Sequence, residues 1–95
     1  MAIRQFGLAM ANLQEVPRRK EKDPDAERFG RIIRRLRESR GWTQDEMASR
    51  AGMNGSYLGF VERGENVPTL SVILLLADTL GEDAGDLVRE VARSR

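Results

Sequence analysis

Residues 43–64 read TQDEMASRAGMNGSYLGFVERG, and this stretch decides the fold. It opens with a capping box, because the Thr43 hydroxyl and the Glu46 carboxylate can each accept a hydrogen bond from the other residue's backbone amide. The helix that starts there is short, since Gly52 soon follows and takes the left-handed backbone conformation that other residues resist. The stretch therefore predicts a short helix that ends in a sharp turn.

A second short helix is predicted directly after the turn. Either Asn54 or Ser56 can cap its first turn, and Gly64 ends it. Leu58 and Val61 lie three residues apart and form an apolar inner face. The sequence thus predicts two short helices that pack against each other across a glycine turn.

Three more helices are predicted around this pair from capping residues and from apolar residues at helical spacing. Their start signals are Asp23-Pro24, Pro68-Thr69 and either Glu82 or Asp83, and two of their stop signals are Gly41 and Gly81. Their apolar positions are Phe29, Ile32, Ile33 and Leu36, then Val72–Ala77 with Leu80, then Ala84, Leu87, Val88 and Val91. The middle helix is apolar nearly all round, which predicts burial on two sides. No segment alternates as a β-strand does, so the predicted fold class is all-α with five helices.

Composition narrows the possible functions. The 95 residues fit one small domain, and 40% hydrophobic with 33% charged residues is typical of a soluble globular chain. Cysteine and histidine are absent, which removes disulfides, thiolate or imidazole metal ligands and every nucleophile built on them. The carboxylates fall at helix ends, where capping explains them. We therefore expect neither an enzyme nor a protein with a cofactor or metal.

The longest apolar run spans only Val72–Ala77, so no membrane-spanning segment is expected. The first residues also lack the pattern of a signal peptide, which predicts a cytoplasmic protein.

The formal net charge of +1 hides an asymmetry along the chain. Residues 1–42 carry eleven cations and six anions, whereas residues 43–95 carry five cations and nine anions. The basic stretch is Arg18, Arg19, Lys20, Lys22, Arg28, Arg31, Arg34, Arg35, Arg37 and Arg40, and the acidic end holds Asp78, Glu82, Asp83, Asp86 and Glu90. The basic stretch is open to two interpretations, a surface that lies along phosphates or a solvated helix face.

The spacing of several residues identifies a family resemblance. The residues that carry it are Gln44, Ala48, Gly52, Leu58, Val61, Glu62-Arg63-Gly64 and Pro68-Thr69-Leu70. They closely resemble the helix-turn-helix of the Cro and phage-repressor family, often called XRE-type, over about residues 26–90. The family includes restriction-modification controller proteins. The resemblance implies a lambda-repressor-like fold, with residues 1–25 as an N-terminal extension or basic arm and residues 26–92 as a DNA-binding and dimerisation domain.

By this resemblance the second helix of the pair enters the major groove while the first braces the DNA backbone. The implied DNA-binding residues are Thr43, Gln44, Asn54, Gly55, Ser56, Tyr57, Gly59, Phe60 and Arg63. Gln44 is expected to cap the bracing helix against a phosphate. Gly55, Gly59 and Phe60 offer no side-chain hydrogen bond to a base edge, so direct readout should be thin and DNA shape should carry part of the specificity.

Several of these residues have a structural alternative. Phe60 either packs on a thymine methyl group or covers the core edge or a partner chain. Ser56 contacts the DNA or caps the helix, and Arg63 contacts a base or a phosphate. Tyr57 is expected to place its ring against the bracing helix and its hydroxyl on a phosphate.

The resemblance also predicts a structural ion pair. Arg37 and Glu62 stand where the family pairs an arginine of the first helix with the glutamate of the recognition helix. This pair should tie the two helices together.

A monomer of this size contacts too few base pairs for specificity, and the family binds paired half-sites as symmetric dimers. The expected dimer interface is apolar and comprises Leu74, Leu75, Leu87, Val88 and Val91. The alternative is that these residues form the monomer's own core.

Residues 1–25 lie outside the resemblance. Ile3, Phe6, Met10 and Leu13 would form an apolar stripe on a short helix. This segment is open to packing on the partner subunit, disorder or recruitment of another protein. The following Arg18-Arg19-Lys20 are suited to an arm over phosphates or in a minor groove.

Together these features predict a cytoplasmic, sequence-specific transcriptional regulator, prokaryotic or from a phage, that binds an inverted-repeat operator in double-stranded DNA as a homodimer. It would repress or activate according to position, with RNA polymerase or a cognate protein as a further partner. The alternative is a protein-interaction adaptor that keeps the helix-turn-helix as a scaffold, because the recognition surface is poor in polar side chains.

Overall fold

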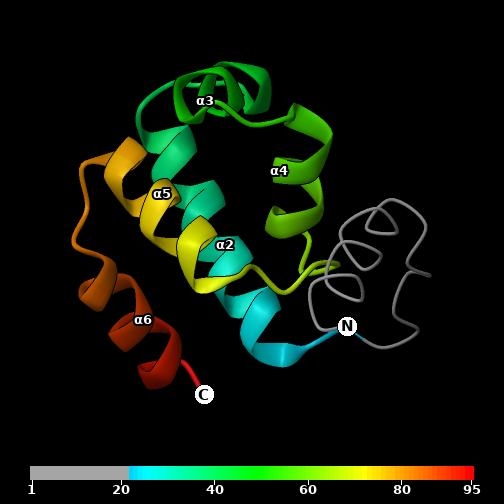
Figure 1. Ribbon diagram of the computed structural model, residues 1–95. Helices are drawn as coiled ribbons and strands as arrows, with labels where there is room; N and C mark the ends of the chain where they lie inside the picture. The colour runs from blue at the N-terminus through cyan, green and yellow to red at the C-terminus, as the bar shows by residue number, and fades with distance from the viewer. Residues whose placement is uncertain (1–21) are drawn as a thin grey trace, which may run out of the picture.

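The computed structural model describes residues 22–95, which form five α-helices and no strand (Figure 1). The helices are α2 (Pro24–Ser39), α3 (Gln44–Ala51), α4 (Gly55–Glu62), α5 (Leu70–Leu80) and α6 (Ala84–Arg93). This confirms the predicted all-α fold class. The helical part begins at Pro24, two residues before the predicted domain boundary at residue 26. The apolar stripe and the basic arm predicted for the N-terminal extension lie outside the described residues.

The predicted capping residues set the helix bounds. Asp23 accepts a hydrogen bond from the Ala26 amide at the start of α2, and both hydrogen bonds of the capping box at Thr43 and Glu46 are formed. Asn54 caps α4 by accepting from the Ser56 amide. Of the two cap candidates for α4, the structure therefore uses Asn54 and leaves the Ser56 side chain exposed.

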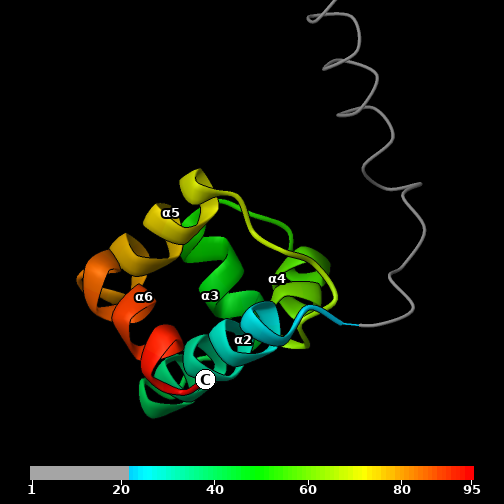
Figure 2. The ribbon, with the colours of Figure 1, turned by 90° about the horizontal axis from the view of Figure 1, so that it is seen from below.

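All five helices contribute to one hydrophobic core. Its buried members are Phe29, Ile32, Ile33, Met47, Ala48, Leu58, Val61, Leu76, Ala77, Leu80 and Leu87. Helix α2 runs through the middle of the molecule, with α4 on one side and α6 on the other (Figures 1 and 2). This arrangement holds α3 and α4 at one end, away from α6.

Helix α2 and helix α4 touch at Gly30. A Cβ atom on this residue would overlap the backbone carbonyl oxygens of Val61 and Glu62, so only glycine fits at the crossing. The sequence pattern did not single out Gly30, because the constraint comes from a segment 31 residues away.

The prediction that the helix now labelled α5 is buried on two sides is wrong. Only Leu76, Ala77 and Leu80 are buried, whereas Leu70 is 69% and Leu74 is 51% exposed. The reason is that neighbouring helices cover one face of α5 and nothing among residues 22–95 covers the other. An exposed apolar face is thus left on the molecule.

Two residues of the basic stretch, Arg35 and Arg40, pair with the acidic end of the chain. Arg35 makes two hydrogen bonds to Glu90, at 2.7 and 3.2 Å, and Arg40 reaches the Glu82 carboxylate at 3.1 Å. The hydrogen bond from Arg35 lowers the pKa of Glu90. These contacts fasten α2 to the C-terminal part of the fold, which favours a structural role over a phosphate-facing one for this part of the stretch.

Candidate nucleic-acid interface

The outer face of the α3–α4 pair forms a shallow hollow of about 330 Å³. Its lining residues are Gln44, Asp45, Gly55, Ser56, Gly59, Phe60 and Arg63, which we call the reading surface. On the opposite face of α4, Leu58 and Val61 are completely buried and fix the helix to the core. Helix α4 therefore has one face locked inside the protein and one face open.

An ion pair ties α4 to α2, as the sequence predicted. The Arg37 guanidinium donates to both Glu62 carboxylate oxygens, at 2.7 and 3.0 Å. Arg37 is 8% and Glu62 is 6% exposed, so the pair is buried. Arg37 also donates to the Trp42 backbone carbonyl at 2.7 Å. The hydrogen bond with Glu62 raises the pKa of Arg37, which stays charged.

Gln44 joins this buried network. Its side-chain amide nitrogen donates to a Glu62 carboxylate oxygen at 2.9 Å. Gln44 is the first residue of α3, and the residue that caps the helix is Thr43. The Gln44 side chain thus connects the start of α3 to the end of α4.

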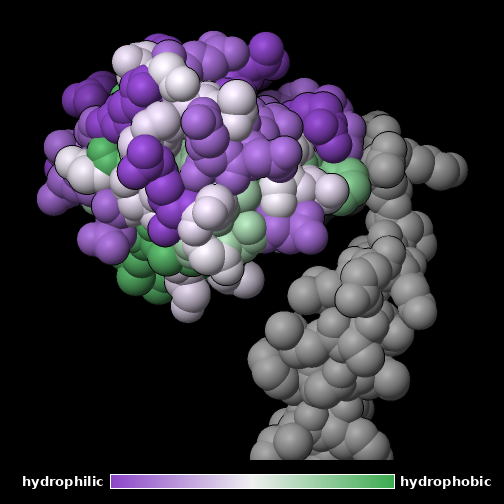
Figure 3. Space-filling model, turned by 90° about the horizontal axis from the view of Figure 1, so that it is seen from above, coloured by the Kyte–Doolittle hydropathy of each residue, from purple (hydrophilic) through white to green (hydrophobic). Residues whose placement is uncertain are grey.

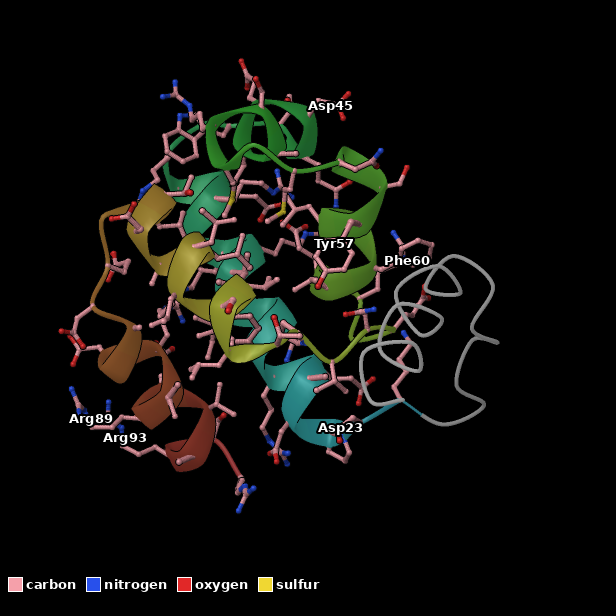
Figure 4. The ribbon with its side chains drawn as sticks, in the orientation of Figure 1. Asp23, Asp45, Tyr57, Phe60, Arg89 and Arg93 are labelled. Carbon is pink, nitrogen blue, oxygen red and sulfur yellow. The ribbon has the colours of Figure 1, made fainter. Side chains whose placement is uncertain are left out.

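Tyr57 and Phe60 lie about one turn apart on α4 and have different surroundings (Figure 4). Tyr57 packs against the core, burial raises its pKa, and its hydroxyl donates to Asn66 at 3.2 Å. Phe60 lies on the reading surface, where the Arg63 guanidinium carbon is 5.2 Å from the ring centroid. Tyr57 is thus partly buried against the core, and its hydroxyl proton is donated to Asn66.

Two glycines of the reading surface are covered by side chains of their neighbours. A Cβ atom on Gly55 would overlap a carboxylate oxygen of Asp45. A Cβ atom on Gly59 would lie 3.0 Å from an Arg63 guanidinium nitrogen and 3.5 Å from the Gln44 amide oxygen. Asp45 and Arg63 therefore occupy the space that side chains at positions 55 and 59 would otherwise fill.

Comparison with known proteins identifies the family and the fold. The family described as "Helix-turn-helix domain" matches residues 28–91, which is most of the described chain. The chain belongs to the helix-turn-helix family of DNA-binding transcriptional regulators. This family, of XRE type, consists of regulators and not of enzymes, as the sequence predicted.

Two relatives illustrate the match to this family. The "uncharacterized HTH-type transcriptional regulator YazB" of Bacillus subtilis (strain 168) is 40% identical over 63 residues, which is 66% of this chain and 91% of YazB. The "uncharacterized HTH-type transcriptional regulator y4dJ" of Sinorhizobium fredii (strain NBRC 101917 / NGR234) is 39% identical over 59 residues, which is 62% of this chain and 77% of y4dJ.

Solved structures show the same fold. The restriction-modification controller protein C.AhdI from Aeromonas hydrophila aligns with a TM-score of 0.64 at 38% identity, over 66% of this chain and 96% of that protein. The clp gene regulator ClgR from C. glutamicum aligns with a TM-score of 0.68 at 27% identity, over 74% of this chain and 91% of that chain. In this helix-turn-helix regulator, α3 and α4 are accordingly the two helices of the motif.

The sequence missed Asp45 as a member of the reading surface. The glycines on the outer face of α4 indicate that this face lacks side chains of its own, but no sequence signal shows which neighbouring residue fills the space. Arg89 and Arg93, by contrast, project from α6 on the side of the molecule away from α4 (Figure 4). Within residues 22–95 no cluster of acidic side chains is arranged to hold a metal ion, and no helix there is long and apolar enough to cross a membrane.

An apolar patch lies outside the reading surface, mainly along α5. Its exposed members are Val67, Leu70, Leu74, Leu75 and Val88. Figure 3 shows hydrophobic surface along one edge, on the side of α5, while the rest of that face is mainly hydrophilic. Leu87 is 1% exposed and belongs to the core of its own chain, and Val91 is half-buried. Of the residues expected at the dimer interface, Leu74, Leu75 and Val88 are exposed and can contact a second copy of the chain.

Proposed function

We propose that this protein binds an inverted-repeat operator as a homodimer and regulates transcription from the promoter at which the operator lies. One observation carries the proposal: a fully folded helix-turn-helix unit presents an open recognition helix while the same chain leaves leucine side chains of α5 exposed. One α4 can contact only a few base pairs, so specificity in a genome requires two half-sites.

The exposed apolar face supplies the contact between the two copies. A two-fold interface uses the same patch on both subunits, and the side chains of Leu70 and Leu74 on α5 are suited to such self-complementary packing. Val88 of α6 is exposed as well and lines a pocket together with Val67 and Ile73. Leu70 is an addition to the interface expected from the sequence, and Leu87 is omitted because it is already buried.

The edge of the reading surface supplies the phosphate contacts in this proposal. Ser56 is exposed at the start of α4, and its hydroxyl makes no hydrogen bond within the described residues. Thr43 and Gln44 stand at the start of α3, where backbone amides and the helix dipole favour a phosphate. Asn54 and Tyr57 support α4 through the hydrogen bonds that they make inside the protein.

The first experiment is selection of bound sequences from a random duplex library at near-physiological salt, followed by the salt dependence of the best site. We expect an inverted repeat whose half-site centres are about one helical turn apart. If no sequence is enriched, the result contradicts operator binding and favours the alternative function as a protein-interaction adaptor. Ser56→Ala should weaken binding to all sequences by a similar factor, because a phosphate contact carries no sequence information.

The dimer is tested separately by sedimentation. Leu74→Glu should shift the protein to monomers and abolish cooperative occupation of the two half-sites, because a charge would be buried in the interface. Ser49→Glu is the matched control, since it adds the same charge at an exposed residue of α3, outside the apolar patch. A wild-type chain that sediments as a monomer at all concentrations used for DNA binding would contradict the dimer.

A further inference from the structure

The recognition helix has an unusual outer face for a helix that reads bases. Gly55 and Gly59 have no side chains, and Phe60 has no hydrogen-bonding group. The major groove, however, presents donors and acceptors that only polar side chains can distinguish. The polar groups must therefore come from residues beside the glycines.

Asp45 supplies an acceptor at position 55. Its carboxylate oxygen lies against Gly55, in the space where a longer side chain on α4 would begin. Asp45 is exposed, and no ion pair or side-chain hydrogen bond engages its carboxylate within residues 22–95. An unpaired carboxylate would repel phosphates, so its place on the reading surface is costly unless a donor on the DNA meets it.

Arg63 supplies donors at position 59. Its guanidinium lies over Gly59 and near the Phe60 ring. The Glu65 carboxylate holds one edge of the group, with Nε and Nη2 at 3.4 Å from its two oxygens. Glu65 is 14% exposed at its side chain and Arg63 is 51% exposed, so the anchor is mostly buried and the guanidinium is open. Nη1 and the second hydrogen of Nη2 remain to donate to a ligand.

We propose that Asp45 and Arg63 carry the direct base readout of this protein, Asp45 by accepting a hydrogen bond from the N4 amino group of a cytosine and Arg63 by donating to O6 and N7 of a guanine. A carboxylate has acceptors only, so it suits cytosine better than adenine, whose N7 acceptor lies beside its amino group. A guanidinium has donors only and matches the two acceptors of guanine. The inference rests on the proposed binding of an operator.

The test for Asp45 is a change of the preferred base. The selection from a random duplex library is repeated with Asp45→Asn, because asparagine offers both a donor and an acceptor and pairs with adenine. We expect one position in each half-site to change from cytosine to adenine, and the affinity for the wild-type site to fall about tenfold to a hundredfold. Affinity for random DNA should rise at the same time, because a negative charge is removed.

The matched control for this variant is Asp78→Asn, which removes the same charge from an exposed residue of α5. It should leave the selected sequence unchanged. If Asp45→Asn raises the affinity for every sequence by the same factor and keeps the same selected bases, Asp45 only repels DNA and the inference is wrong.

The test for Arg63 uses a modified base. Replacing the selected guanine by 7-deazaguanine removes N7, and we expect this to weaken wild-type binding about tenfold. The same replacement should have little effect on DNA binding by the Arg63→Ala variant, because the side chain that would donate to N7 is already absent. Arg31→Ala is the control, since Arg31 is an exposed arginine on α2 beside α6.

A phosphate contact by Arg63 would give a different result from a contact with guanine. If Arg63→Ala weakens binding to all sequences equally and lowers the salt slope by about one ion, Arg63 contacts a phosphate. Thermal unfolding of each variant checks that it is folded before its DNA binding is measured. Wild-type protein that selects an inverted repeat unchanged by either substitution overturns this inference alone, whereas wild-type protein that selects nothing overturns the proposed function with it.

Discussion

Helix α4 makes two close approaches at glycine residues, and the two are built differently. At Gly30 of α2 the missing Cβ leaves room for backbone carbonyls of α4. At Gly55 and Gly59 of α4 itself the space is taken by the ends of the Asp45 and Arg63 side chains. Backbone within a helix cannot move without breaking hydrogen bonds, whereas side-chain ends can. The first approach is therefore a fixed part of the fold, and the second leaves groups that a ligand can engage.

The largest effect on stability should come from the ion pair between Arg37 of α2 and Glu62 of α4. Glu62→Ala leaves the buried Arg37 without its partner, so we expect the free energy of unfolding to fall by about 3 to 5 kcal/mol. Arg37→Ala with Glu62→Ala should lose less than the sum of the single changes. Urea unfolding of the four proteins measures this coupling.

The control is the exposed pair of Arg34 and Glu38 on α2. Glu38→Ala should cost less than about 0.5 kcal/mol, because water screens the charges. Additive losses at Arg37 and Glu62 would show that the two residues do not stabilise each other.

The second largest effect should follow Gly30→Ala. The new methyl group meets two backbone carbonyl oxygens, and α2 must move away from α4. We expect a loss of about 3 kcal/mol, which lowers the Tm of a domain of this size by about 10 to 25 °C. Thermal unfolding followed by circular dichroism measures the change. A Tm close to that of the wild type would mean that the crossing is not rigid.

Gly59→Ala is the matched change where α4 contacts only side-chain ends. Unlike Gly30→Ala, it should not lower the free energy of unfolding. The methyl group meets only the Arg63 and Gln44 side-chain ends, which can turn aside. Alanine is the better helix former by about 1 kcal/mol, so the free energy of unfolding should stay the same or rise by up to that amount. DNA binding should weaken, because Arg63 is displaced. A Gly59→Ala protein as unstable as Gly30→Ala would remove the distinction between the two approaches.

The smallest effect concerns the exposed attachment of α2 to α6. Arg35 lowers the pKa of Glu90 below its ordinary value of 4.5, so this pair stabilises the fold above that pH and ceases to do so as the pH falls and Glu90 takes up a proton. Glu90→Gln should therefore reduce the free energy of unfolding at pH 7, by less than about 1 kcal/mol because the pair is exposed. The difference from the wild type should vanish in acid. Urea unfolding from pH 7 to pH 3 tests this, and a difference that stays constant would contradict it.

Much of the fold could be predicted from local sequence signals. The capping box at Thr43 and Glu46, the caps at Asp23 and Thr69 and the left-handed Gly52 are all formed. Such signals act within one helical turn, so neighbouring residues are enough to determine them. The partnership of Arg37 and Glu62 was also predicted, but through the family resemblance and not through local spacing.

The reading surface was predicted only in part, because glycine carries no information about what lies next to it. The pattern placed Gly55, Gly59 and Arg63 on the outer face, yet it could not show that Asp45 would stand against Gly55. In the same way, the apolar sequence of α5 did not reveal which of its faces the other helices would cover. Leu87 fits a helical interface pattern as well as a core pattern, and only packing assigns it to the core.

The sequence by itself determined the five helices, their ends and the family to which the chain belongs, because capping, turns and helical periodicity depend on residues close together in the chain. The tertiary structure alone decided that Gly30 must be glycine, that Arg35 of α2 pairs with Glu90 of α6, and that Asp45 and Arg63 cover the bare face of α4. These features depend on atoms that distant segments bring within contact distance, and such distances exist only once the chain has folded.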